Sequence, residues 1–446
     1  MQIDDRSLYE LEIFADRKSS ACLFELFVPT QSQGGQEKLS VMLRSPKQSY
    51  DEIIALQDTL KFLIANLDFW KISVDDRLLG NIEKYWRSSI IPCQSTNRLW
   101  LWIEKYRYRE IFFQLEKGVH DVRTLLMELK RIIVSASDQN LPDYLRSKIL
   151  AVKSFLADKN IEFLLDHEKP ASHEIFRLDY LLRVVFKNQL RQAVDLLYQL
   201  DALISIAQTI EKFHWQFPDV KESASPLLNL VELYHPLLDH PQPVSIAFES
   251  GKNMLFLTGP NMSGKTTFIK SMGIAVYLAH LGLAVPASQM TLSPFDFLIT
   301  NIKTEDDIRL GYSYFFSEVK RVKSIAELVR TNQKGLIISD ELFKGTNIHD
   351  AYEASKWVIQ GFSRWSNSIF ILSSHLAELQ SEIEPIENMV CKYFEVNMRD
   401  GIPEYSYRLK DGVSTQRLGL FLLWQEGIME LLGQGTTTGI KNSHHE

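Results

Sequence analysis

The stretch "LFLTGPNMSGKTTFIKSM", residues 255–272, decides the fold expected for this chain. An apolar run that is typical of a buried strand leads directly into a glycine-rich segment. Gly259, Gly264, Lys265 and Thr266 match the pattern G-x-x-x-x-G-K-[ST], in which a tight loop connects a strand to a helix. The glycines let successive backbone amides point at one anion, and the N-terminus of the helix adds its positive dipole end. The stretch therefore predicts a phosphate-binding loop.

ATP with Mg²⁺ is the ligand that this pattern predicts. Lys265 is expected to reach the β- and γ-phosphates, and the hydroxyl of Thr266 is expected to coordinate Mg²⁺. A chance match arises in on the order of one or two chains in a hundred of this length, but here a strand-like run precedes the pattern and a helical pattern follows it. The predicted nucleotide-binding residues are Gly259, Pro260, Asn261, Met262, Ser263, Gly264, Lys265, Thr266 and Thr267.

Two further apolar runs end in polar side chains. "GLIISDELFKGT", residues 335–346, is a strand pattern that ends in Asp340 and Glu341. Asp340 is predicted to hold the Mg²⁺ shell, and Glu341 to orient or deprotonate the attacking water. An acidic N-cap for the next helix is the alternative interpretation. "SIFILSSH" ends in His375, which is predicted to sense the γ-phosphate, although a lone histidine is more often structural. The predicted catalytic residues are thus Glu341 and His375.

The chain divides near residue 220. Before it, glycine is scarce and apolar residues recur at helical spacings, as in "SYDEIIALQDTLKFLIANL". Residues 173–214 form a helical pattern far longer than the average helix of about 11 to 12 residues. Beyond a cluster of prolines, short apolar runs alternate with helical patterns, which indicates a largely parallel sheet. We therefore expect a multidomain protein: an all-α lever or core domain over residues 1–225, a P-loop α/β domain over 226–433, and a polar tail over 434–446 that is disordered.

Composition narrows the class of protein. A chain of 446 residues with 45% hydrophobic and 24% charged residues is expected to be a globular protein of two or three domains. No apolar run reaches the roughly 18 residues of a membrane span, and the N-terminus has no signal-peptide pattern. Three scattered cysteines are expected to be reduced packing residues, so a cytoplasmic location is predicted. The net charge of −7 gives no general attraction to nucleic acid, so any DNA contact must come from a local basic patch or an enclosing shape.

Several segments together resemble the MutS family of DNA mismatch-repair ATPases, whose ATPase domain is of the ABC class. The segment "TGPNMSGKTTFIKSMG" is similar to the family's phosphate loop, including its Pro-Asn-Met insert. "DDIRLGYSYFFSEVKRV" resembles the family's signature segment, and the N-terminal "MQIDDRSLYELEIF" resembles the start of its lever domain. Further resemblance lies in the segments "DELFKGTNIHDA", "SSHLAEL" and "YRLKDGVSTQRLGL".

The resemblance implies a homodimer in which Ser313 contacts the nucleotide of the partner subunit in trans. It also implies that ATP binding favours a closed dimer and that the long helical arms convert closure into gripping or releasing DNA. Departures from the family pattern are Lys344, where many relatives have arginine, and Ser374, where many have threonine. No counterpart of the mismatch-reading and connector domains is recognised, so DNA contacts are expected to be structure-selective or non-specific.

Other functions remain open at this point. The chain could be an ABC-type ATPase that regulates a protein partner without direct DNA recognition, or a partner protein could supply the substrate recognition. A transporter ATPase is disfavoured because no L-S-G-G-Q segment and no membrane span is recognised. A small-metabolite kinase is disfavoured because the helical arm gives no sign of a lid or an acceptor pocket.

Overall fold

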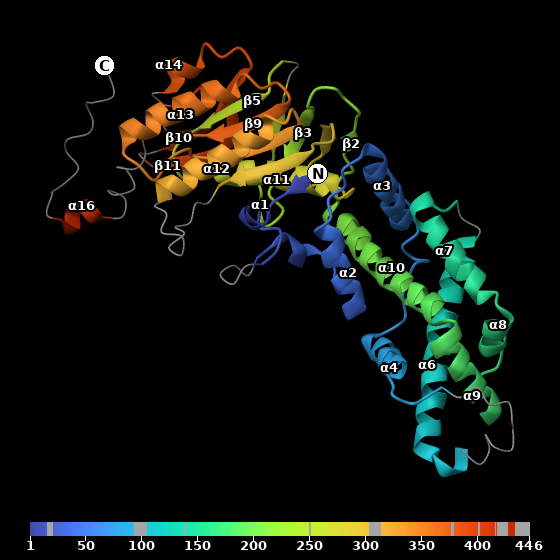
Figure 1. The fold of residues 1–446 in the computed structure, drawn as a ribbon. Helices are drawn as coiled ribbons and strands as arrows, with labels where there is room; N and C mark the ends of the chain where they lie inside the picture. Colours follow the sequence, from blue (N-terminus) through green and yellow to red (C-terminus); the bar gives the residue numbers. More distant parts are fainter. Residues whose placement is uncertain are drawn as a thin grey trace. The chain divides into compact units, whose positions relative to one another are not determined.

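The computed structural model describes residues 1–15, 21–92, 105–137, 140–248, 251–302, 314–375, 379–399, 402–414, 416 and 427–432 (Figure 1). The chain forms two compact units. The first, called the sheet unit here, comprises Met1–Ser20, Pro218–Tyr277 and Pro286–Glu446. The second, called the helical unit, comprises Ala21–Phe217 and Leu278–Val285.

The helical unit contains the helices that the apolar spacings predict. Its helices are α2 (Gln33–Leu43), α3 (Tyr50–Ala65), α4 (Asp76–Trp86), α6 (Arg109–Ser137), α7 (Asp143–Leu156), α8 (Lys159–Asp166), α9 (Ser172–Tyr180) and α10 (Lys187–Phe213), with a short 3-10 turn η1 (Leu23–Leu26). Ser49 begins α3 with a capping box, in which its side chain accepts from the Glu52 amide and the Glu52 side chain accepts from the Ser49 amide. Helix α10 contributes the largest share of the buried residues, because its middle turns are enclosed by α2, α3 and α7.

The long helical pattern over residues 173–214 is helical as expected, but it is not one α-helix. A π-helical turn, η2 (Leu181–Val185), lies between α9 and α10, and the Phe186 amide donates to the Leu181 carbonyl, five residues back. A π-turn adds a residue to the helical repeat and so changes which face the following helix presents. The hydrophobic period alone does not reveal this insertion.

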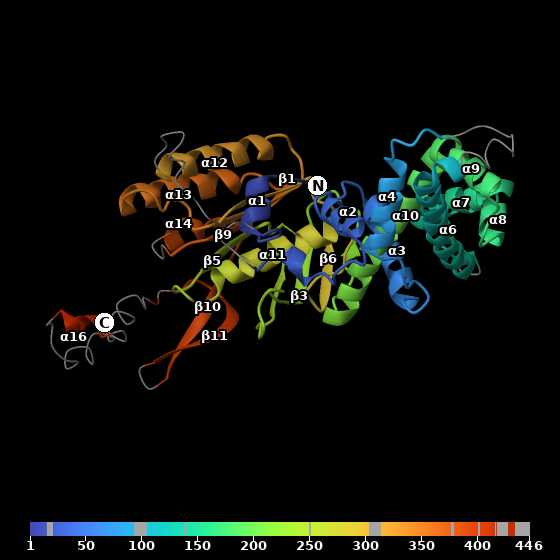
Figure 2. The ribbon, with the colours of Figure 1, turned by 90° about the horizontal axis from the view of Figure 1, so that it is seen from below.

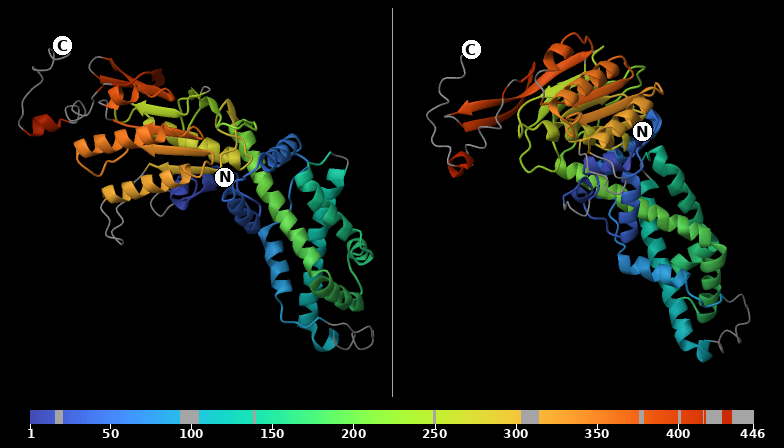
Figure 3. Two further views of the ribbon diagram at one scale, coloured as in Figure 1. Left: turned by 45° about the horizontal axis from the view of Figure 1, so that its top comes forward. Right: turned by 60° about the vertical axis from the view of Figure 1, so that its left-hand side comes forward.

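The sheet unit is built on a seven-stranded sheet of order β1-β7-β8-β9-β5-β10-β11. All its neighbours pair in parallel except β10 and β11, which form the long antiparallel hairpin seen in Figure 3. The strands are β1 (Gln2–Ile3), β5 (Met254–Thr258), β7 (Phe297–Asn301), β8 (Gly335–Asp340), β9 (Ser368–Ser373), β10 (Met389–Arg399) and β11 (Ile402–Asp411). A smaller sheet of order β2-β6-β3-β4 joins β2 (Asp219–Val220), β6 (Gln289–Leu292), β3 (Leu228–Leu233) and β4 (Val244–Ala247).

Helices cover both faces of the larger sheet (Figure 2). Helices α12 (Tyr314–Val329), α13 (Ile348–Phe362) and α14 (Gln380–Ile383) pack on one face, where apolar residues of β5, β7, β8 and β9 form the core. Helix α11 (Lys265–His280) lies on the other face with α1 (Asp5–Glu10); a short helix, α16 (Ile428–Leu431), follows near the C-terminus. Because both faces are buried, the central strands read as continuous apolar runs, which is why β5, β8 and β9 are predicted correctly.

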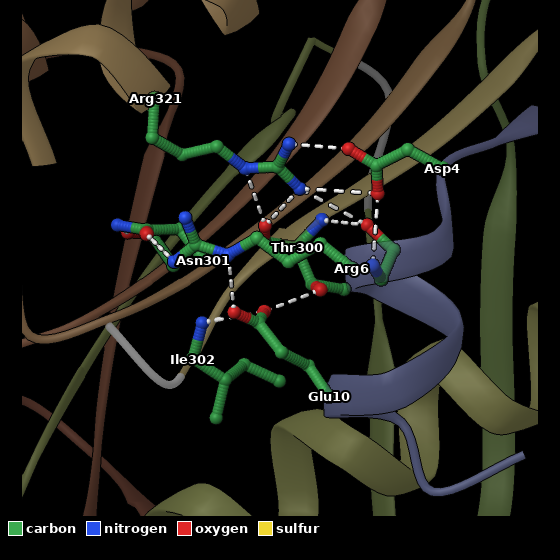
Figure 4. Close-up of polar contacts among 9 residues, drawn as sticks. Asp4, Arg6, Glu10, Thr300, Asn301, Ile302 and Arg321 are labelled. Atoms are coloured by element: carbon green, nitrogen blue, oxygen red, sulfur yellow. Dashed lines mark hydrogen bonds and ion pairs between the residues drawn. The ribbon is translucent and has the colours of Figure 1, made fainter. Parts of the chain in front are cut away.

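The N-terminal segment belongs to the sheet unit, although the predicted helical domain, residues 1–225, includes it. Gln2 and Ile3 pair with Phe297 and Leu298 as a parallel edge strand. Helix α1 then contacts β7 through polar side chains, including a bond from Thr300 Oγ1 to Glu10 Oε2 of 2.6 Å (Figure 4). These long-range contacts have no signature in the N-terminal sequence itself.

No helix in the described part of the chain is long and apolar enough to cross a membrane. The predicted polar tail, residues 434–446, lies outside the described residues.

Candidate functional site

The candidate site lies at the carboxyl ends of three adjacent strands, β8, β9 and β5. Strand β5 ends at Thr258 and is followed by residues 259–264, called the glycine loop here, and then by α11. Strand β8 ends at Asp340 and is followed by residues 341–345, called the acidic turn. Parallel strands place their carboxyl ends at one edge of a sheet, where ligands bind in open α/β folds. The predicted residues of both segments therefore meet at one edge.

The glycine loop takes a backbone that requires its glycines. Gly259 has φ of 141° and Gly264 has φ of 101°, a region that residues with a Cβ rarely enter. A Cβ on Gly259 would lie 2.9 Å from Ser263 Oγ, so a side chain there would also force the serine hydroxyl to move. The Ser263 hydroxyl itself is buried and has no hydrogen-bond partner within the described chain. The loop thus has a tight backbone and a polar group with unused bonding capacity.

Lys265 closes the glycine loop from the first turn of α11. Its Nζ donates to the Gly259 carbonyl at 2.6 Å and to the Pro260 carbonyl at 3.1 Å. Burial lowers the pKa of Lys265, and the carboxylates of Glu341 and Asp340 act in the opposite direction. The ammonium is therefore held inside the loop, with two acidic side chains near enough to influence it.

Asp340 is fixed by hydroxyl groups from two other elements. Thr266 Oγ1 of α11 donates to Asp340 Oδ2 at 2.6 Å, and Ser373 Oγ of β9 donates to Asp340 Oδ1. The structure thus brings together the two residues that the sequence predicts as metal ligands. A carboxylate and a hydroxyl are oxygen ligands of the kind that Mg²⁺ prefers.

Glu341 begins the acidic turn in a left-handed conformation, with φ of 58°. Its amide donates to the Ser373 carbonyl at 3.1 Å. Its Oε2 lies 3.2 Å from the Lys344 ammonium and 3.8 Å from Nδ1 of His375, whose side chain is 59% exposed. His375 is thus near the predicted base, and Lys344 is an additional cation at the site.

A cavity of about 520 Å³ opens beside the glycine loop. Its wall includes residues 261–268 and Ser271, Glu341 from the acidic turn, and Phe394 and Tyr407 from the β10–β11 hairpin. The rest of the wall is formed by residues 233–235, 238–242 and 244. The cavity lies within the sheet unit, and its volume is in the usual range for small-molecule sites, about 300–1,000 Å³.

Much of this cavity wall is not predicted from the sequence. In the segment after β3 the sequence shows only prolines, which break helices. Its place beside the glycine loop depends on the pairing of β3 with β4 and β6. His235 in this wall is 6% exposed. Burial lowers the pKa of His235 to about 4; Glu12 opposes this and Lys270 adds to it, so the imidazole is neutral at pH 7. A histidine followed by proline gave no signal strong enough to single it out.

Ser313 and the part of the signature segment before it, residues 306–312, lie outside the described residues, whereas residues 314–322 of the same segment begin α12. The role of Ser313 in a partner's site stays a prediction.

The fold and the site together define a multidomain α/β protein with a cavity at the carboxyl ends of the strands of a mostly parallel sheet. Residues 255–429 match the family model for MutS domain V. The chain is 24% identical over 263 residues to the DNA mismatch repair protein MutS of Oceanobacillus iheyensis. This alignment covers 56% of this chain and 30% of the relative. Identity to the proteins of the same name is 26% over 295 residues in Bacillus pumilus and 25% over 329 residues in Staphylococcus aureus strain Newman.

These last two alignments cover 62% and 71% of this chain, and 33% and 37% of the relatives. The resemblance to the MutS family is therefore confirmed through residues 255–429, which match its domain V, and the chain spans only about a third of the length of the relatives that it matches.

Proposed function

We propose that the chain is a MutS-like ATPase that binds ATP with Mg²⁺, hydrolyses it, and couples nucleotide-driven dimer closure to DNA binding in mismatch repair or a related DNA process. The observation that carries the proposal is that Lys265, Thr266 and Glu341 line one cavity, and that Asp340 accepts a hydrogen bond from Thr266 beside it. The match to MutS domain V and the names of the relatives support the link to DNA repair.

The residues of the glycine loop fit the phosphates of a nucleotide. Residues of the loop and of the first turn of α11 line the cavity, and the amides at a helix N-terminus are suited to bind an anion. The Ser263 hydroxyl, which has no hydrogen-bond partner among the described residues, supplies a further polar group. Lys265 would exchange its two carbonyl acceptors for phosphate oxygens, which bind an ammonium more strongly because they are charged. Thr266 and Asp340 would hold Mg²⁺, which when bound supplies charge neutralisation at the phosphate oxygens.

Glu341 is the residue that we assign to the attacking water. Its carboxylate lines the cavity, so it can accept a proton from water or orient it. Lys344 and His375 lie beside the same carboxylate and can adjust its orientation as the site fills. Completion of the site by Ser313 of a second subunit, and hence a homodimer, is part of the proposal and rests on the family resemblance.

A second candidate is an ABC-type ATPase that regulates a protein partner and does not recognise DNA directly. The observation that favours it is the net charge of −7, because DNA-binding proteins gain much of their affinity from cations that contact phosphates. The two candidates differ in one measurable property: binding to DNA that weakens steeply as salt concentration rises.

The test measures ATP hydrolysis with no DNA and with single-stranded, duplex, mismatched and branched DNA, together with ATP affinity and DNA affinity at several salt concentrations. We expect hydrolysis that depends on Mg²⁺, salt-sensitive DNA binding, and less than about tenfold preference for a mismatch, because no element that could insert at a base step is recognised. Hydrolysis without any DNA binding would favour the protein-partner candidate.

Lys265→Ala provides the decisive variant for the nucleotide site. It removes the side-chain cation of the glycine loop, and each hydrogen bond to a charged group is worth about 10- to 100-fold in affinity. We expect ATP affinity to fall by at least that factor in a titration with labelled nucleotide. Lys323→Ala, on the exposed surface of α12, is the matched control. Equal ATP affinity in the Lys265 variant and wild type would contradict the assignment of the site.

A further inference from the structure

The acidic turn is a strained segment. Both Glu341, with φ of 58°, and Phe343, with φ of 59°, take the left-handed conformation although neither is glycine. Such residues persist in a fold only where surrounding contacts hold them. Because Glu341 is the proposed base, the contacts that hold this turn also determine where its carboxylate lies.

Helix α12 supplies contacts of this kind. Glu318 is 1% exposed, and its two carboxylate oxygens accept from the amides of Lys344 and Gly345, each at 3.1 Å. These amides are the carboxylate's hydrogen-bond partners in the described chain. The ring of Phe315, on the same helix, packs against the buried ring of Phe343 with 5.8 Å between centroids.

The geometry of the contact fits a carboxylate. The Lys344 amide bonds Oε1 and the Gly345 amide bonds Oε2, whereas a glutamine in the same position would place its NH₂ group, a donor, against one of these two amides. Burial raises the pKa of the Glu318 carboxyl, and the amides of Gly345 and Lys344 act against that rise. The amides of the acidic turn thus compensate a buried charge that would otherwise be unfavourable.

Helix α12 is itself held in place one turn further along. Nε of Arg321 donates to the Thr300 carbonyl, near the end of β7, at 2.9 Å (Figure 4). The same guanidinium also donates to the Asp4 carboxylate and, at 3.1 Å, to Ser7 Oγ. Glu10 Oε2 accepts from the Ile302 amide at 2.8 Å in the same cluster. The N-terminal segment and the end of β7 therefore fix the helix that holds the acidic turn.

We propose that Glu318 is a positioning residue for ATP hydrolysis, which holds the strained acidic turn so that the carboxylate of Glu341 stays at the cavity. The inference rests on the proposed function, because it assigns Glu318 a role in hydrolysis through Glu341. Glu318 is not among the described residues that line the cavity, and it acts through the backbone of Lys344 and Gly345.

The experiment compares Glu318→Gln and Glu318→Ala with Glu327→Gln, a control on the same helix whose side chain is 63% exposed in wild type. Three quantities are measured: turnover at saturating ATP, ATP affinity, and hydrogen exchange of the amides of the acidic turn. We expect turnover to fall by roughly 10- to 100-fold, since small displacements of a reacting group have effects of that size. ATP affinity should change little, and the Lys344 and Gly345 amides should exchange at least about tenfold faster.

A conservative variant separates positioning from a merely structural role. Glu318→Asp keeps both acceptor oxygens on a shorter side chain, so it should retain more turnover than Glu318→Gln. Equal turnover in wild type and Glu318→Ala would overturn the inference, and so would a loss of ATP affinity in step with the loss of turnover. If wild type does not hydrolyse ATP, the proposed function fails and the catalytic role of Glu318 fails with it. Exchange rates then still decide whether Glu318 holds the turn, and unchanged rates would show that it does not.

Discussion

The glycine loop and the acidic turn occupy equivalent places in the sheet unit but reach their shapes differently. Each follows a central parallel strand at its carboxyl end, and each contains residues with positive φ. In the glycine loop two of the three such residues are glycines, and the lysine that closes the loop is the next residue in the chain. In the acidic turn they are Glu341 and Phe343, held by Ser373 of β9 and Glu318 of α12. Local sequence encodes the first shape, and tertiary contacts impose the second.

The largest effect that separates the two segments is expected from Glu341→Gln. We expect the glycine loop to bind the nucleotide and the acidic turn to act in hydrolysis, so this variant should bind ATP normally. Its turnover should be about 10²- to 10⁴-fold slower, which is the usual effect of losing a positioned base. Single-turnover hydrolysis and an ATP titration on the same preparation measure the two quantities.

The neighbouring carboxylate gives the matched control for this variant. Asp340→Asn, which alters the partner of Thr266 and Ser373, should weaken the Mg²⁺-dependent part of ATP binding instead. Normal turnover in Glu341→Gln would remove Glu341 from the mechanism and would leave the strain of the acidic turn without a catalytic explanation.

The same contrast explains what the sequence could and could not predict. Strands β5, β8 and β9 can be predicted from the sequence because both sheet faces are covered, which makes these strands continuous apolar runs. The glycine loop can be predicted because its pattern is local in the sequence. Asp340 and Glu341 stand out because a buried strand rarely ends in two carboxylates. The pairing of β1 with β7 is a tertiary event, and residues near 233–244 become part of the site only when β3 pairs with its neighbours. Glu318 lies within the segment that resembles the family's signature, and nothing in the sequence indicates its bonds to the acidic turn, because these are tertiary contacts.

The part of the cavity wall that contains His235 can be tested with pH. The pKa of His235 is lowered by burial to about 4 from 6.5, so between these values the unfolded chain binds more protons at this position than the folded chain does. Stability contributed by the neutral imidazole is therefore present above pH 6.5 and is lost as pH falls towards 4. The contribution is up to about 3 kcal/mol, since one pKa unit corresponds to about 1.4 kcal/mol.

His235→Asn keeps an acceptor near the position of Nδ1, which faces the Leu237 amide, but does not titrate. The free energy of unfolding in urea, measured from pH 4 to 7.5, should fall less steeply towards acid in this variant than in wild type. His349→Asn, on the exposed surface of α13, is the control and should follow wild type. Parallel pH profiles for the His235 variant and wild type would show that the imidazole is not buried against the cavity as described.

The smallest expected effect tests whether the glycine loop is encoded by its glycines. Gly264 has φ of 101°, and a Cβ there would lie 3.2 Å from Tyr407 Cδ1, so Gly264→Ala introduces both backbone strain and a close contact. Strain of this kind is worth about 1–3 kcal/mol. We expect the free energy of unfolding in urea to fall by that amount.

Gly361→Ala makes the same chemical change where neither condition holds. Gly361 lies in α13, and a Cβ there would meet nothing within 4 Å. Alanine is favoured over glycine in helices, so this variant should gain up to about 0.5–1 kcal/mol. Opposite signs for the two substitutions would mean that the glycine loop owes its shape to its own residues. Equally small changes in the free energy of unfolding would mean that tertiary contacts hold the glycine loop, as they hold the acidic turn. A loop held by tertiary contacts would tolerate an added side chain wherever the neighbouring residues could move.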